Sequence, residues 1–193
     1  MPSSIEIPLS IALGIGLAAA TGFRIFLPLL VAGVAANAGV IPLHDSFQWL
    51  ASTAALLTLG TAALVEALAY YVPGVDHLLD LLATPAAMAA GIIISASVMA
   101  DIPSQIMWPV AIIAGGGIAG LTKGSAALLR AKTGVATGGL GNPVISTGET
   151  IGAVALSLLA IALPFIALLA VLTLVIWAAR KAGRRLFRRP RPG

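Results

Sequence analysis

The chain contains no cysteine and very little charge. Only 9% of its 193 residues are Asp, Glu, Lys or Arg, whereas soluble globular domains carry about 25%. The lack of cysteine excludes disulfides, thiolate metal ligands and thiol nucleophiles. The scarcity of charge, together with 59% hydrophobic residues, excludes an ordinary soluble domain and predicts an integral membrane protein.

The hydrophobic residues are grouped in long runs that are nearly or wholly free of charge. A bilayer core is crossed by about 20 residues of helix, and lipid offers the backbone no hydrogen-bond partners. We therefore predict an all-α fold, a polytopic transmembrane helical bundle. The runs are Ile7–Gly22, Trp49–Val65, Leu81–Ala100 and Ile151–Ala179.

Glycines and prolines divide these runs into five or six membrane segments with broken helices. The first apolar stretch as a whole, about Ile7–Val40, is too long for one straight crossing. It is therefore either one kinked helix or two half-length pieces. The last stretch is divided by Pro164, and a hairpin there or at Gly22 raises the count to six. A Gly-rich linker is expected over 133–147. Helices are expected over about 7–40, 48–72, 77–100, 104–132 and 147–181.

Most of the basic residues lie at the C-terminus. We predict a single transmembrane domain over 1–181 and a disordered basic tail over 182–193. Basic segments stay in the cytoplasm, which predicts a multi-pass protein of the inner (plasma) membrane with a cytoplasmic C-terminus. The tail can also contact anionic lipid headgroups. It lacks the aromatic residues and the fold of a nucleic-acid-binding segment, so no nucleic acid is expected as a partner.

The orientation of the middle of the chain stays open. Five crossings place Arg130 and Lys132 outside the cell, which the positive-inside rule disfavours. If the last apolar stretch crosses twice, both residues return to the cytoplasm. The sequence does not decide between these arrangements.

Two segments resemble each other at an offset of 101 residues. Gly14–Thr21 matches Gly115–Thr122, and a cation follows each copy, Arg24 and Lys123. Three crossings between the copies would give an inverted repeat, as in many transporters and channels. Ordinary packing of small residues in membrane helices would give the same pattern, so both interpretations stay open.

Several polar residues lie inside or at the edge of the expected bilayer. A charge at that depth is costly unless it is paired, hydrated or bound to an ion. Each also has a local interpretation: Glu66 as an interfacial carboxylate, Glu149 as a first-turn acid of the last helix, and Arg24 as an interfacial cation if the chain turns at Gly22. The predicted ion or solute pathway comprises Arg24, Glu66, Asp80, Asn142 and Glu149.

Three consecutive glycines, Gly115, Gly116 and Gly117, lie within the fourth expected helix. Each destabilises a helix by roughly 1 kcal/mol relative to alanine. They allow a neighbouring backbone to approach closely, or allow the helix to unwind where protein or a water-filled cavity covers it. We predict a backbone break there, next to the pathway.

Asp76, His77 and Asp80 form a candidate metal site, because His77 and Asp80 share a helix face. No second His-rich segment completes a cage, and helix capping accounts for both acids. We therefore expect no cofactor. Ser, His and Asp do not occur at catalytic spacing, so we do not expect an enzyme.

Four segments together resemble a known family. The sequence resembles, over about residues 10–175, the bacterial membrane family called domain of unknown function 4126. The resemblance implies a polytopic bacterial membrane protein of about this length and no known activity. The segments are GLAAATGFRIFLPLL (16–30), VPGVDHLLDLLATP (72–85), WPVAIIAGGGIAGL (108–121) and GGLGNPVISTGE (138–149).

The polar residues, the glycines and the repeat predict a small transporter or channel for an ion or small polar solute. A chain of this length needs a homo-oligomer to enclose a pathway, with membrane lipids as further partners. The alternative is a non-transporting accessory, scaffolding or lipid-binding subunit. A water-filled cavity reaching Arg24 and Glu66 favours transport, whereas a dry core with Arg24 bonded to a carboxylate favours the subunit.

Overall fold

The computed structural model describes residues 6–71, 75–138 and 141–186, with the backbone alone at 75–81, 178–179 and 181–186. The described residues are helical and contain no strand, which confirms the all-α prediction. The elements are α1 (Glu6–Thr21), α2 (Phe26–Asn37), the 3-10 helix η1 (Asp45–Ala51), α3 (Thr53–Ala69), α4 (Val75–Ser97), α5 (Ser104–Val110), the π-helix η2 (Ala111–Gly116), α6 (Gly117–Thr137), α7 (Asn142–Ala162) and α8 (Pro164–Leu186).

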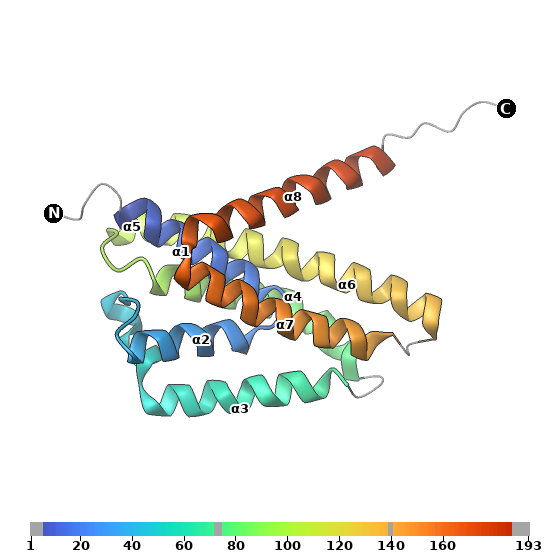
Figure 1. Cartoon of the computed structure of the whole chain (residues 1–193), viewed down its shortest axis with the longest axis horizontal. Coiled ribbons are helices and arrows are strands. Elements are labelled where there is room, and N and C mark those ends of the chain that lie inside the picture. Colours follow the sequence, from blue (N-terminus) through green and yellow to red (C-terminus); the bar gives the residue numbers. More distant parts are fainter. Residues whose placement is uncertain (1–5, 72–74, 139–140, 187–193) are drawn as a thin grey trace.

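The helices lie roughly along one axis and alternate in direction (Figure 1). We call the two ends of the bundle the α1 end, where α1 begins, and the α7 end, where α7 begins. α1 runs inward from the α1 end, the chain turns at residues 22–25, and α2 returns to the α1 end. Then α3, α4, the continuous rod of α5, η2 and α6, α7 and α8 follow in alternating directions. The first apolar stretch is thus two shorter pieces, one of the two predicted arrangements.

Within the described residues, two helical segments are long and apolar enough to cross a membrane, the rod Ser104–Thr137 and α7. Together η1 and α3 make a third candidate, bent by 65°. These spans agree with the predicted membrane protein. Five or six crossings stay a prediction, because the other apolar helices are shorter: Glu6–Thr21, Phe26–Asn37, Leu82–Ser97 and Pro164–Trp177.

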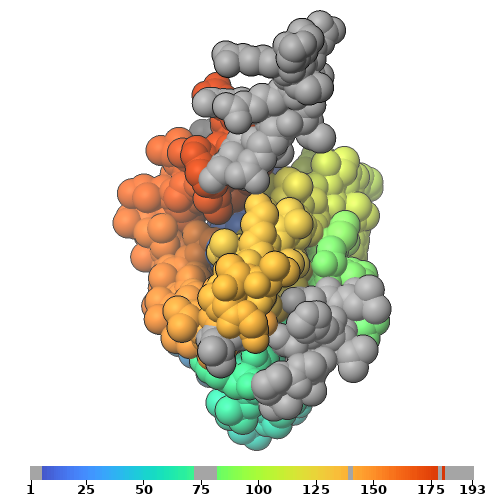
Figure 2. Space-filling model, turned by 90° about the vertical axis from the view of Figure 1, so that its right-hand side faces the viewer, coloured from blue at the N-terminus to red at the C-terminus, as the bar shows by residue number. Residues whose placement is uncertain are grey.

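α1 is the central helix of the bundle. It contacts α4, α6, α7 and α8, and its second half is almost completely buried. Small residues allow this crowding: a Cβ on Gly16 would lie 2.8 Å from the Cβ of Ala160 and 3.3 Å from that of Ala167. Figure 2 looks onto the α7 end, where α6 and α7 lie beside each other in front of the interior.

Several predicted boundaries were wrong. The linker predicted over 133–147 is only the short segment between α6 and α7. Thr133 and Thr137 continue α6, and their hydroxyls donate to backbone carbonyls one turn earlier. α6 is capped by Gly138, whose φ of +60° suits glycine at a helix C-terminus. α8 continues to Leu186, past residue 181, where the last helix was predicted to end.

The two similar segments are not inverted. α1 and α6 run in the same direction along the bundle (Figure 1), because the turn at 22–25 adds a reversal that the expected three crossings did not include. The ends of the copies lie in contact: a Cβ on Gly22 would lie 2.4 Å from the Cβ of Thr122 and 2.9 Å from the backbone nitrogen of Lys123.

The helix stays continuous through Gly115–Gly117 instead of unwinding as predicted. The irregular backbone expected there is the π-helix η2, and it packs against α4. A Cβ on Gly115 would lie 2.7 Å from the carbonyl oxygen of Gly91 and 2.6 Å from the Cβ of Ser95. A Cβ on Gly14 of α1 would lie 2.9 Å from the hydroxyl of Ser95. We call this contact of α1, α4 and η2 the glycine seam, made by Gly14, Gly91, Ser95 and Gly115.

Candidate functional site at the tip of the hairpin

The turn between α1 and α2 lies inside the protein. Backbone hydrogen bonds from Gly22 to Ala19 and from Phe23 to Ala20 close it. Because the turn backbone lies directly against α6 at Gly22, a residue with a side chain does not fit there. Arg24, the third residue of the turn, is 1% exposed. The prediction that a turn at Gly22 would leave Arg24 at an interface was therefore wrong.

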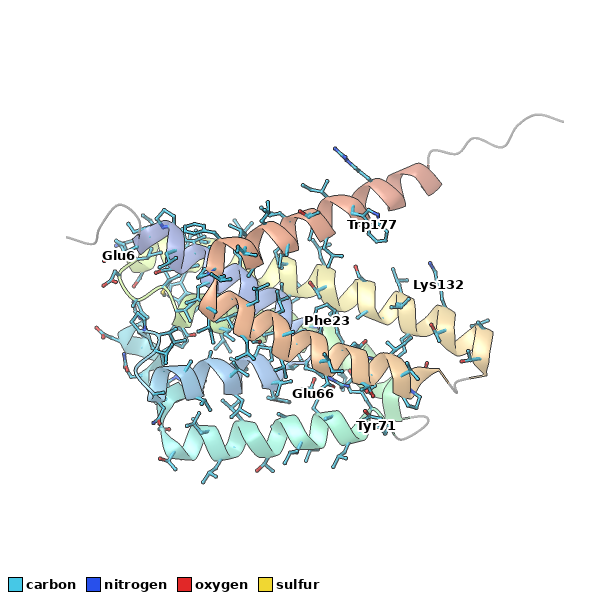
Figure 3. All side chains as sticks on the ribbon, in the orientation of Figure 1. Glu6, Phe23, Glu66, Tyr71, Lys132 and Trp177 are labelled. Atoms are coloured by element: carbon cyan, nitrogen blue, oxygen red, sulfur yellow. The ribbon has the colours of Figure 1, made fainter. Side chains whose placement is uncertain are left out.

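Glu66 reaches the hairpin tip from α3 (Figure 3). Its carboxylate accepts hydrogen bonds from the backbone N–H groups of Ile25 at 2.8 Å and Phe26 at 3.1 Å. The first N–H groups of a helix have no partner within the helix, and a negative charge there also suits the helix dipole. Glu66 is 8% exposed, so it is a buried cap of α2 and not an interfacial carboxylate.

Arg24 is held by neutral oxygens of α7. Its Nε donates to the hydroxyl of Thr150 at 3.0 Å, and its Nη2 donates to the carbonyl of Ser146 at 2.9 Å and to the Ser146 hydroxyl at 2.5 Å. Among the described residues it forms no ion pair, so neither Glu66 nor Glu149 is its partner. Its Nη1 is buried and has no hydrogen-bond partner among these residues.

Tyr70, at the end of α3, is surrounded by three cations. The guanidinium carbons of Arg24 and Arg130 lie 4.5 and 4.3 Å from the centre of its ring. The ammonium group of Lys123 lies 5.0 Å from the same point and donates to the Tyr70 hydroxyl at 2.9 Å. Such cation–π contacts stabilise a desolvated cation by about 2 kcal/mol. All three cations are at most 4% exposed.

Glu149 of α7 and Arg130 of α6 form a buried ion pair. Both side chains are 5% exposed, and Arg130 donates from Nη2 to Oε2 of Glu149. Glu149 is therefore not only an acid near the start of its helix. Arg130 was predicted at one membrane surface or the other. Its side chain instead lies in the interior of the helical bundle.

The inward face of α7 supplies the remaining polar groups. Its buried residues recur every three to four positions, as one face of a helix requires. Asn142 begins α7 and is 8% exposed, and its Oδ1 lies 3.6 Å from the place of a Cβ on Gly134. The buried set is Asn142, Ser146, Glu149, Ala153, Ser157 and Ala160.

These residues form a single group, which we call the Tyr70 cluster: Arg24, Glu66, Tyr70, Lys123, Arg130, Ser146, Glu149 and Thr150. Three of the five predicted pathway residues belong to it. Asn142 lies one turn from Ser146 on the same face of α7. The side chains of Asp76, His77 and Asp80 lie outside the described residues, so their predicted roles stay predictions. The described residues contain no group of three His, Cys, Asp or Glu that could hold a metal ion.

Sequence reasoning missed five of the eight residues of the cluster. Two tyrosines at the end of an apolar run are typical of an aromatic belt, but Tyr70 is 4% exposed and Tyr71 45%. A signal was present for α6, because Lys123 and Arg130 are seven residues apart and therefore share a helix face. Ser146 and Thr150 gave no signal, since hydroxyl residues are ordinary in membrane helices.

Two shallow surface grooves, with volumes of about 520 and 480 Å³, lie away from the cluster. The first lies along α3 at Leu57–Val65, and the second along α8 at Ile166–Trp177. Neither groove is lined by a residue of the Tyr70 cluster.

The model of the family DUF4126, a domain of unknown function, matches residues 11–184. The chain belongs to this family. The match includes the hairpin, the glycine seam and every residue of the Tyr70 cluster, so the site lies wholly within the DUF4126 domain. No curated protein and no solved structure matches the chain.

Proposed function

We propose that this DUF4126 protein is a small transporter or channel that moves an ion or small polar solute past the Tyr70 cluster. One observation carries the proposal: five charged side chains are buried around the tip of a hairpin that ends inside the bundle. They are Arg24, Glu66, Lys123, Arg130 and Glu149. Ionisable residues inside a membrane protein are costly and mark ion or substrate pathways.

The backbone of the hairpin tip supports the same proposal. Non-helical backbone at membrane depth is tolerated only inside protein or beside a water-filled space. In many transporters, broken helices present their ends to the substrate near the middle of the bilayer. Here the turn at residues 22–25 places the end of α1 and the start of α2 beside the cluster. The proposed protein is not an enzyme and needs no cofactor.

For the topology we propose five crossings and a re-entrant hairpin in the plasma membrane, with the α7 end in the cytoplasm. The crossings are α3, α4, the α5–α6 rod, α7 and α8, and α1 with α2 forms the hairpin. Lys132 lies toward the α7 end and Glu6 at the α1 end (Figure 3), as the positive-inside rule requires. Of the seven C-terminal basic residues, four lie at the end of α8 and three follow it in the sequence. α8 also runs toward the α7 end (Figure 1).

The absence of cysteine makes this topology directly testable. Single Glu6→Cys and Lys132→Cys variants would be labelled in intact cells with a membrane-impermeant maleimide. We expect labelling at position 6 without lysis and at position 132 only after lysis. Labelling of both in intact cells would contradict the arrangement.

The transport proposal is tested by flux into liposomes that contain only the purified protein. We expect flux of at least one small ion or polar solute, strongly reduced in Glu66→Gln and Glu149→Gln. Lys132→Gln removes an exposed charge from α6 and serves as the matched control with unchanged flux. Absence of flux for sodium, potassium, protons, chloride, nitrate and small polyols would overturn the proposal.

A second candidate is a non-transporting accessory, scaffolding or lipid-binding subunit. The observation in its favour is close packing: the surface grooves do not reach the Tyr70 cluster, and the glycine seam leaves no room for an added methyl group. Flux by the protein alone decides between the two candidates. The homo-oligomer that we propose for either role is measured by light scattering in detergent.

A further inference from the structure

Arg24 carries a buried positive charge without an acidic partner among the described residues. The three hydrogen bonds from its Nε and Nη2 go to hydroxyl and carbonyl oxygens, and its guanidinium stacks on Tyr70. An arginine does not lose its proton in a protein. A charge at 1% exposure is costly unless another charge compensates it.

Neither described carboxylate of the cluster pairs with Arg24. The two oxygens of Glu66 accept from the backbone of Ile25 and Phe26, one each. Glu149 pairs with Arg130. These two acids bond to α6 and to the hairpin backbone, so no carboxylate among the described residues contacts the guanidinium of Arg24.

Two further cations lie near Arg24. Lys123 and Arg130 approach the same tyrosine ring at 5.0 and 4.3 Å. Arg130 is paired with Glu149, and Glu66 caps α2, so the described charged side chains of the cluster are three cations and two carboxylates. The described charges of the cluster thus sum to +1, which an anion would compensate.

One donor group of Arg24 is available to a ligand. Nη1 is fully buried and bonds to no described residue, although both of its N–H groups are donors. A buried donor without a partner destabilises the folded protein. A negatively charged ligand would satisfy the donor and compensate the charge with one contact.

From these observations we infer that Arg24, beside Tyr70, binds a small monovalent inorganic anion of the size of chloride or nitrate. This anion is also the solute that crosses the membrane, and this second part of the inference rests on the function proposed above. The anion is small because Arg24 is only 1% exposed and is bonded through two of its nitrogens. It is monovalent because, among the described residues, the guanidinium of Arg24 lacks a counter-charge.

Binding is tested on the whole protein in detergent by calorimetry and thermal unfolding. Sodium chloride, bromide or nitrate replaces sodium gluconate at constant ionic strength, so that only the anion changes. We expect saturable heat and a saturable rise in Tm, since a ligand that binds the folded state stabilises it. Sodium sulfate should give neither signal.

Two variants locate the site. Arg24→Lys keeps the charge but removes the Nη1 donor, and it should weaken chloride affinity at least tenfold. Lys132→Gln removes an exposed cation and should leave chloride affinity unchanged. An Arg24→Lys protein with the affinity of the unmodified chain would overturn the assignment. If Arg24→Lys fails to fold, the unmodified protein still decides, because lack of saturable binding of all three anions overturns the inference.

Parallel flux measurements separate this inference from the proposed function. Saturable chloride binding without flux of any solute would support the anion site and overturn transport. Flux of a cation or neutral solute without anion binding would support transport and overturn the anion site. Chloride or nitrate flux that falls at least tenfold in Arg24→Lys would support both.

Discussion

The Tyr70 cluster and the glycine seam both hold irregular backbone inside the bundle, but by opposite means. The seam accommodates the π-helix η2 by removing side chains, so that backbones of α4 and η2 lie in direct contact at Gly91 and Gly115. The cluster accommodates the turn of the hairpin by adding long polar side chains that bond to it, as Glu66 does. The seam should therefore be sensitive to added atoms, and the cluster to lost charges.

The largest expected effect comes from breaking the ion pair of the cluster. Glu149→Leu leaves Arg130 buried without this carboxylate, and loss of one partner of a buried pair costs about 3–5 kcal/mol. The double variant Glu149→Leu/Arg130→Met removes both charges and should recover much of that loss. Unfolding free energies in detergent measure both, with Lys132→Met as the control. A double variant less stable than Glu149→Leu would contradict the ion pair as the cause.

The glycine seam offers a matched pair of substitutions with opposite signs. Gly115→Ala places a methyl group against Ser95 and Gly91, and such overpacking costs about 1–3 kcal/mol. A Cβ at Gly117 meets no atom within 4 Å, so Gly117→Ala should gain about 0.5–1 kcal/mol through helix propensity. Thermal unfolding of the two variants provides the measurement. Equal shifts for both would mean that close packing is not the role of the seam.

The cap of the hairpin should have a smaller and more local effect. Glu66→Gln retains one acceptor oxygen, so the N–H of Ile25 or of Phe26 loses its bond. Loss of a helix cap costs about 0.5–2 kcal/mol. Hydrogen exchange should accelerate at these two amides and stay unchanged within α7. Glu6→Gln, which alters an exposed acid, is the control, and uniform exchange rates across all three proteins would refute the capping role.

Substitution of the two adjacent tyrosines should give the smallest losses of stability. Tyr70→Phe removes the acceptor of Lys123 but keeps the ring that Arg24 and Arg130 contact. A typical hydrogen bond contributes about 0.5–1.5 kcal/mol. Tyr71→Phe removes a bond to Thr147 at an exposed position and should cost less. Chemical unfolding of both proteins tests the order, and a larger loss for Tyr71→Phe would be the contrary result.

The sequence indicated an interrupted first helix but not the depth of Arg24. Glycines at 14, 16 and 22 disfavour a continuous helix, and an arginine between two apolar runs requires polar neighbours. A turn at Gly22 was expected to leave Arg24 at an interface, and its actual neighbours could not be predicted. Thr150 and Ser146 are 126 and 122 residues away along the chain, and only the packing of α7 beside the hairpin brings them together.

The three consecutive glycines show a second limit of prediction from the sequence. Unwinding and close approach require the same residues, and the choice depends on the helix that lies opposite. Gly91 and Ser95 of α4 are small enough for η2 to approach, so the chain keeps its helical hydrogen bonds. For Tyr70 and Tyr71, the sequence does not show which ring faces the interior. Adjacent helical residues point about 100° apart, so one of them is buried while the other faces outward.

The central position of α1 has a consequence for how the protein is made. α1 is synthesised before the helices that it contacts: Gly16 lies against Ala160 and Ala167, and Arg24 bonds to α7. The hairpin therefore cannot reach its final place until α7 and α8 have been synthesised. We expect that truncation before α7 leaves the hairpin accessible to protease.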